Sequence, residues 1–157
     1  MKTQLVHALL VLVAAFVLAL TPLQAQAHCS NASTAGNWAY TYTGTIFTQS
    51  GPLLAASVGH YKQDAAGNVT GSQTRSVEGD SGVEDVAGSV TVNKDCTATG
   101  TIKVFVNGQL QRTSVLALAY DSNGNHVRMI FESLTLADGT KVPIVITVDG
   151  NRLFSKD

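Results

Sequence analysis

The sequence has little charge, and neither sign of charge is in excess. Only 13% of its 157 residues are charged, and 10 Lys and Arg residues against 11 Asp and Glu residues leave a net charge of -1. Nucleic acids and anionic membrane surfaces attract proteins with a basic excess, so neither is expected as the main partner. The hydrophobic fraction of 45% argues against a disordered chain, and the length indicates a single domain.

The sequence also lacks the short motifs of common catalytic and metal sites. It contains no HExxH, GxSxG, CxxC or phosphate-binding-loop pattern, and its two cysteines have no cluster of histidines beside them. The acidic stretch 78–85 carries four carboxylates without the spacing of an EF-hand, and we interpret it as a solvated turn. No catalytic residue, metal ligand or cofactor is therefore predicted, and an enzyme is not the favoured class.

The N-terminal segment has the three parts of a secretory signal peptide. Lys2 precedes an uninterrupted apolar run over residues 8–20, and Ala25 and Ala27 form an A-x-A cleavage site. The run is shorter than the roughly 20 residues that span a bilayer. We therefore predict a signal peptide at 1–27, a single domain at 28–157, and a secreted or periplasmic protein with no stable membrane insertion after cleavage. An uncleaved anchor and a lipoprotein are the alternatives.

The two cysteines are expected to form a disulfide bond. An exported chain enters an oxidising compartment, where two cysteines usually pair. Cys29 lies at the start of the mature chain and Cys96 lies in a turn-like segment at 93–96. The bridge would close a loop of about 67 residues, which stabilises the fold by about 4 kcal/mol in the chain-entropy model.

Turn residues divide the mature chain into segments typical of strands. Asn-Gly, Asp-Gly and related clusters provide the positive φ angles of tight hairpins, and they occur at 64–68, 107–108, 121–125, 138–139 and 149–150. The segments between them are rich in Val, Thr, Ile and Tyr. Strands are predicted at 37–46, 53–63, 69–78, 83–93, 97–106, 109–120, 126–136 and 141–148, with a short ninth piece at 151–154. Pro143 suggests an edge or closure position.

Alternation along these segments predicts which residues face the core. The expected inner faces are Trp38, Tyr40 and Tyr42; Val86, Val90 and Val92; Ile102, Val104 and Val106; Leu110, Leu116, Leu118 and Tyr120; Val127, Met129 and Phe131; and Val142, Ile144, Ile146 and Val148.

Eight hairpin-linked strands must hide their edges, so we predict an all-β fold, an antiparallel up-and-down meander closed into an eight-stranded barrel. A β-sandwich is the alternative. An outer-membrane barrel is disfavoured, because aromatic residues are only 6% and the loops are short.

The first strand opens with Gly36-Asn37-Trp38, which resembles the G-x-W signature of the lipocalin, or calycin, family. The resemblance implies an eight-stranded barrel in which Trp38 closes one end and packs under a basic residue near the last strand. Arg152 is the matching basic residue, and a guanidinium over an indole ring is a favourable pair. Most of residues 29–154 is also similar to small exported bacterial β-proteins of no established function, which implies the barrel and little about activity.

A barrel of this kind is expected to bind a small apolar ligand. Trp38, Tyr40 and Tyr42 are candidate contacts on the first strand, and His60 and Arg75 are candidate polar contacts if their strands turn these side chains inwards. A lone inward histidine is more often a hydrogen-bonded core group than a catalyst, and the simpler interpretation is that His60, Gln73 and Arg75 face solvent. A structural protein with a filled barrel is the first alternative, and a barrel isomerase or cyclase is the second. A cavity of at least about 300 Å³ would favour binding.

Overall fold

The computed structural model describes residues 29–121 and 123–154, and this part of the chain is almost entirely β. It begins with one helical turn, α2 (Asn31–Thr34). The strands that follow are β1 (Gly36–Thr48), β2 (Gly51–Gln63), β3 (Asn68–Val77), β4 (Asp80–Val92), β5 (Thr97–Val106), β6 (Gln109–Tyr120), β7 (His126–Leu136), β8 (Lys141–Val142) and β9 (Ile144–Arg152). The predicted signal peptide at 1–27 lies outside the described residues. Within those residues, no helix has the length and apolar character needed to cross a membrane.

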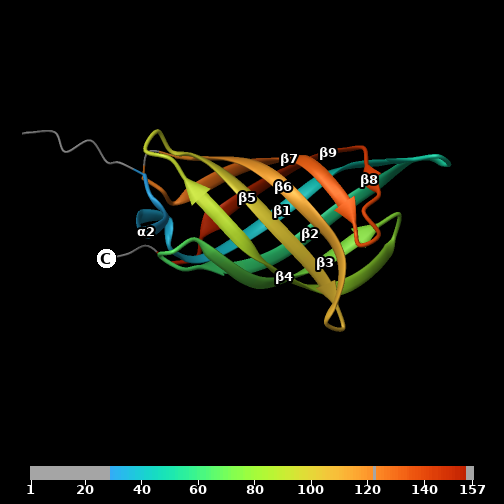
Figure 1. Cartoon of the computed structure of the whole chain (residues 1–157), viewed down its shortest axis with the longest axis horizontal. Helices are drawn as coiled ribbons and strands as arrows, with labels where there is room; N and C mark the ends of the chain where they lie inside the picture. Colours follow the sequence, from blue (N-terminus) through green and yellow to red (C-terminus); the bar gives the residue numbers. More distant parts are fainter. Residues whose placement is uncertain (1–28, 122, 155–157) are drawn as a thin grey trace, which may run out of the picture.

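The sheet closes on itself to form an eight-stranded antiparallel barrel. Consecutive strands pair from β1 through β7, and β9 pairs with both β7 and β1. The strands wrap around a common axis that runs along the long direction of the molecule (Figure 1). The predicted up-and-down barrel is therefore confirmed, and the sandwich alternative is wrong.

The last two strands differ from the prediction because Pro143 interrupts them. The expected strand at 141–148 is split into β8, which pairs only with β7, and β9, which continues to Arg152. Pro143 has no N–H to donate to a ladder, and its carbonyl accepts a hydrogen bond of 2.9 Å from the backbone N–H of Phe47. The separate ninth piece predicted at 151–154 is wrong, since residues 151 and 152 are the end of β9.

Most of the predicted turns are present, but Asp149-Gly150 is not one. Asn107 and Gly108 have φ angles of 51° and 77°, as a tight hairpin between β5 and β6 requires. Gly150, in contrast, lies inside β9 and pairs with Tyr40 and Val127 of the neighbouring strands. A Cβ atom on Gly150 would lie 3.0 Å from Cγ1 of Val127, so close packing between strands, rather than a turn, accounts for the glycine.

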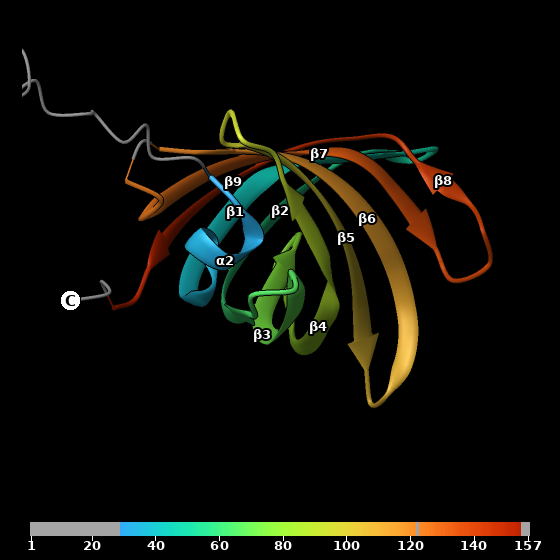
Figure 2. The ribbon, with the colours of Figure 1, turned by 60° about the vertical axis from the view of Figure 1, so that its left-hand side comes forward.

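The helical turn α2 seals one end of the barrel. Figure 2 shows it lying across the opening at that end. Its last residue, Thr34, is fully buried, and its carbonyl accepts a 3.1 Å hydrogen bond from Nε1 of Trp38. The Thr34 hydroxyl accepts a 2.8 Å bond from Nε2 of Gln63, and the Gln63 carbonyl oxygen accepts a 3.3 Å bond from the Tyr120 hydroxyl. Burial raises the pKa of Tyr120 to about 12, so this hydroxyl remains a donor.

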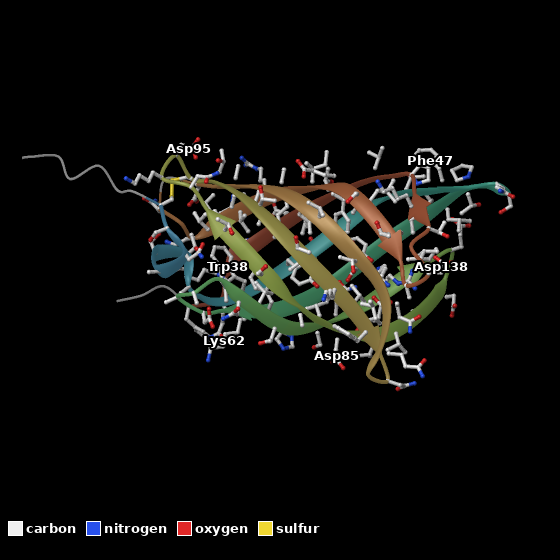
Figure 3. All side chains as sticks on the ribbon, viewed as in Figure 1. Trp38, Phe47, Lys62, Asp85, Asp95 and Asp138 are labelled. Atoms are coloured by element: carbon white, nitrogen blue, oxygen red, sulfur yellow. A yellow bond between two sulfur atoms is a disulfide. The ribbon has the colours of Figure 1, made fainter. Side chains whose placement is uncertain are left out.

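Contacts around the sealed end tie α2 and the residue before it to two hairpins, β2–β3 and β4–β5. Asn31 donates to the carbonyl of Ala66 and accepts from the backbone N–H of Val92, at 3.0 and 2.9 Å. The predicted disulfide joins Cys29, just before α2, to Cys96 in the turn between β4 and β5. Figure 3 shows the sulfur atoms of this bridge at the same end as Trp38, opposite the end where Phe47 and Asp138 lie. The segment from Cys29 to β1 is therefore covalently fixed to the barrel.

Reduction of the Cys29–Cys96 bridge should lower the free energy of unfolding by about 4 kcal/mol, because the bridge constrains a loop with a sequence separation of 67 in the unfolded chain. Urea unfolding with and without a reductant measures the change. The double variant Cys29→Ser/Cys96→Ser is the control. Its free energy of unfolding should equal that of the reduced protein and should not change when the reductant is added. Equal stability of the oxidised and reduced wild-type protein would contradict the prediction.

Candidate functional site

The interior of the barrel contains a cavity of about 370 Å³. It extends from the sealed end toward the opposite end, where the exposed residues Thr48, Gln111 and Leu136 line its mouth. Apolar side chains form most of its wall, and the main ones are Val86, Val90, Ile102, Val104, Leu116, Leu118, Met129, Phe131, Leu134, Ile146 and Val148. This volume lies within the range of small-molecule sites, which starts at about 300 Å³.

A buried carboxylate, Glu84, organises the polar part of the cavity wall. Its Oε1 accepts hydrogen bonds from Nε of Arg75 at 3.0 Å and from Nη1 of Arg112 at 2.8 Å. Its Oε2 accepts from Nε2 of Gln73 at 2.6 Å and from Nη2 of Arg112 at 2.5 Å. The amide oxygen of Gln73 in turn accepts from the Tyr40 hydroxyl at 2.7 Å and from Ser57 at 3.2 Å. We call Tyr40, Gln73, Arg75, Glu84 and Arg112 the polar cluster.

Strand register brings the polar cluster together from four strands. Gln73 on β3 and Glu84 on β4 are directly opposite each other in the ladder, and both side chains are buried. Arg112 on β6 reaches across β5 to Glu84, next to a break in the β5–β6 register between Val104 and Phe105. Such bulges change the direction of nearby side chains. The cluster thus depends on the barrel's curvature as well as on alternation.

The polar cluster carries a net positive charge. Burial by itself would raise the pKa of Glu84, but the hydrogen bonds and charge of Arg112, with those of Gln73 and Arg75, lower it to about 2. Burial lowers the pKa of Arg112, yet its bonds with Glu84 outweigh that effect and raise it. Burial also raises the pKa of Tyr40, so this phenol is neutral. One carboxylate therefore faces two guanidinium groups.

Ser114 adds a polar atom to the wall that has no partner in the described part of the chain. Its side chain is 2% exposed, it lines the cavity, and its Oγ makes no hydrogen bond there. It lies two residues from Arg112 on the same face of β6, about 7 Å along the strand. Buried hydroxyls normally have a partner, so this oxygen is an unsatisfied group in the cavity wall.

Only some of the residues predicted as ligand contacts line the cavity. Tyr40, Tyr42 and Arg75 line the cavity. The interpretation in which Arg75 and Gln73 face solvent is wrong, because both belong to the polar cluster. His60 is exposed on the outer face of β2, since Tyr61 and its alternate neighbours take the inner positions, so the solvent-facing interpretation is correct for this residue and it does not contact the cavity.

Trp38 and Arg152 lie at the sealed end rather than against the cavity. Trp38 is fully buried, and Cζ of Arg152 is 5.2 Å from the centroid of its ring, within the distance of a cation–π pair. Arg152 also donates a 2.8 Å hydrogen bond from Nη2 to the carbonyl of Ser33. The pair therefore joins the last strand to the first strand and to α2, and its role in the structure is closure.

Sequence reasoning missed Glu84, Arg112 and Ser114. The interpretation of 78–85 as a solvated turn is wrong for Glu84, which is only 4% exposed. The signal was present in the alternation, because Glu84 has the parity of Val86 and Val90, and both Arg112 and Ser114 have the parity of the inner leucines of β6. Alternation in the sequence thus places these polar residues at inner positions, but it does not identify their hydrogen-bond partners.

A search of solved structures finds similarity to an S-type phycobiliprotein lyase, CPES, from Guillardia theta. The two chains are 12% identical, the match covers 80% of this chain and 92% of the lyase, and the TM-score is 0.45. A likeness this distant carries no argument about ligand or activity. No family model matches the chain, and no curated protein matches its sequence.

Replacing Glu84 with Gln should destabilise the protein by about 3 kcal/mol at pH 7, because two buried guanidinium groups lose their counter-charge. It should also change the acid response. The pKa of Glu84 is about 2 in the folded state against an ordinary 4.5, so its contribution is complete above pH 4.5 and is lost as the pH falls toward 2.

Urea unfolding of wild type and Glu84→Gln at several pH values from 2 to 7 measures both effects. The stability difference between them should shrink by about 3 kcal/mol over the acid range. Asp85→Asn, which removes the neighbouring exposed carboxylate, is the matched control and should behave like wild type. A constant difference across the pH range would contradict the role given to Glu84.

Proposed function

We propose that this protein is a binding module that holds a small apolar ligand inside the barrel. The observation that carries the proposal is the cavity of about 370 Å³ with a mostly apolar wall. Sites of this volume, lined by apolar side chains with a few convergent polar groups, are typical of small-molecule binding. The sealed end and the opposite mouth give the ligand one route of entry.

The two alternatives have less support. A structural protein with a filled barrel would leave no space of this size between its inner side chains. A barrel isomerase or cyclase would use a group that gains or loses a proton near neutral pH. Glu84 already accepts four hydrogen bonds and has a pKa of about 2, and His60 is on the outer face. The polar cluster is therefore better suited to holding a ligand than to proton transfer.

The protein is further proposed to work outside the reducing cytosol, in the periplasm or the medium. The Cys29–Cys96 disulfide supports this location, because such bonds persist in oxidising compartments. The three-part pattern at 1–27 supports export through a signal peptide. A cavity that is open at one end suits a protein that takes up a ligand in that compartment.

N-phenyl-1-naphthylamine, a neutral apolar probe whose fluorescence rises in apolar surroundings, tests the binding proposal. Wild-type protein should bind it at a single site. Val148→Phe places a ring in the cavity wall and should weaken binding by about tenfold or more, since the cavity is near the lower limit of volume. Val145→Phe, on the outer face of the same strand at a residue that is 58% exposed, is the control and should bind like wild type. A folded wild-type protein that does not bind the probe would overturn the proposal.

Intact mass of the protein recovered from its natural compartment tests the proposed export. Cleavage after Ala27 should give a chain that begins at residue 28, and the disulfide should make it lighter by two hydrogen atoms than the reduced form. The whole-cell lysate treated with a thiol-blocking reagent is the comparison. A mature protein that keeps residues 1–27, or that has free thiols, would contradict the corresponding part of the proposal.

A further inference from the structure

We infer that the ligand of this cavity is a monoanion with a carboxylate head, and that Arg75 and Ser114 bind this head beside the Glu84–Arg112 pair. The inference rests on the proposed function and deepens it, because it assigns the chemical class of the ligand and the residues that select it. Three independent features of the cavity wall support it: its charge, the unused donors of Arg75, and the unpartnered hydroxyl of Ser114.

The charge balance favours one negative charge on the ligand. Glu84 bears one negative charge, while Arg75 and Arg112 bear two positive charges in contact with it. No other charged side chain lines the cavity among the described residues. The Arg75 side chain is 33% exposed, so its charge is partly solvated in the free protein. A single anionic group would neutralise the site, whereas a cationic head would be repelled by both guanidinium groups.

The hydrogen-bond balance places the free donors on Arg75. Both oxygens of Glu84 already accept two hydrogen bonds each, so this carboxylate has little capacity left for another donor. Arg112 spends two of its nitrogens on Glu84, whereas Arg75 uses Nε alone, and its two Nη groups bond nothing in the described part of the chain. A guanidinium edge with free N–H groups matches the flat geometry of a carboxylate.

Ser114 provides a second donor from another strand of the wall, β6 instead of β3. Its hydroxyl is buried and unpartnered in the described residues and lines the same cavity as Arg75. Leu134 and Ile102 face it on the two neighbouring strands, so the strands beside it offer no polar side chain at that level. A ligand oxygen would satisfy a hydroxyl that the protein itself leaves without a bond.

The remaining wall suits an apolar body. Beyond the polar cluster, the cavity continues toward the sealed end between valine, leucine and methionine side chains, including Val90, Leu118 and Met129. The cavity thus has a charged region on one wall and an apolar region between that wall and the sealed end. The expected ligand is a short amphiphile whose carboxylate stays near Arg75 while its apolar part fills the rest of the volume.

Three ten-carbon ligands that differ only in the head group provide the test: decanoic acid, decan-1-ol and decylamine, titrated by calorimetry at pH 7.5. The wild-type protein should bind the acid at least about tenfold more tightly than the alcohol, and the amine most weakly. Arg75→Gln should remove most of the advantage of the acid and leave the affinity for the alcohol unchanged. Arg75→Lys should keep part of it, and Lys103→Gln, which removes an exposed cation from the outer face of β5, should change nothing.

Ser114→Ala gives a second, separate measurement. Because the hydroxyl makes no bond in the described structure, its removal should leave the thermal midpoint of the free protein unchanged or raised, while it weakens binding of the acid severalfold. This combination distinguishes a ligand contact from a structural role. It also keeps the inference testable if Arg75→Gln fails to fold, as does the comparison of acid with alcohol on the wild-type protein.

The outcomes separate this inference from the proposed function. If the wild-type protein binds the acid and the alcohol equally, the assignment of a carboxylate head is overturned, while binding of apolar ligands stands. If Arg75→Gln is folded and binds the acid as tightly as wild type, the role of Arg75 is overturned. If folded wild-type protein binds none of the three ligands and does not bind N-phenyl-1-naphthylamine, both the inference and the proposed function fail.

Discussion

The whole structure depends on β9 pairing along both of its edges. This strand forms antiparallel ladders with β1 on one side and β7 on the other, and these two ladders turn an open meander into a barrel. Closure leaves the eight strands without a free edge. It also commits every second residue of each strand to the interior, so any polar residue at an inner position must find a partner there.

Inner polar residues find their partners in different ways at the two ends of the barrel. At the sealed end, α2 supplies Thr34 as a partner for Trp38 and Gln63, and the cation of Arg152 lies over the indole ring. Toward the mouth, Glu84 gathers two guanidinium groups and an amide on one wall. The first arrangement completes a packed core, and the second leaves a charged region bordering a cavity. The same alternation rule thus yields a structural end and a candidate binding end.

The sequence predicted the fold well because turns and alternation are local signals. Asn107-Gly108 marks a hairpin, and the valines of the fourth segment mark an inner face, without knowledge of the rest of the chain. The errors came where tertiary contacts decide. Gly150 is a glycine because the side chain of Val127 on the neighbouring strand leaves little room for a Cβ atom. Pro143 separates β8 from β9, although the alternation of apolar residues continues across it.

The candidate site was less predictable, because it is made by contacts between strands distant in the sequence. Arg112 meets Glu84 across 28 residues and across the intervening strand β5. Alternation places both side chains inside, yet it does not indicate that they face each other at the same height. A buried carboxylate next to a turn looks like a solvated acidic loop until its partners are known.

The position of the disulfide and α2 at one end has a consequence for the kinetics of ligand exchange. Local opening of a protein follows its least cross-linked regions. The covalent bridge, the bonds of Asn31 and the packing of Trp38 all lie at the sealed end, whereas β8 at the mouth contributes only two residues to the sheet. Breathing motions should therefore be concentrated in the β1–β2 and β7–β8 hairpins, with rapid amide hydrogen exchange there and slow exchange around the bridge. A ligand could then enter and leave on the timescale of hairpin motion while the rest of the barrel stays folded.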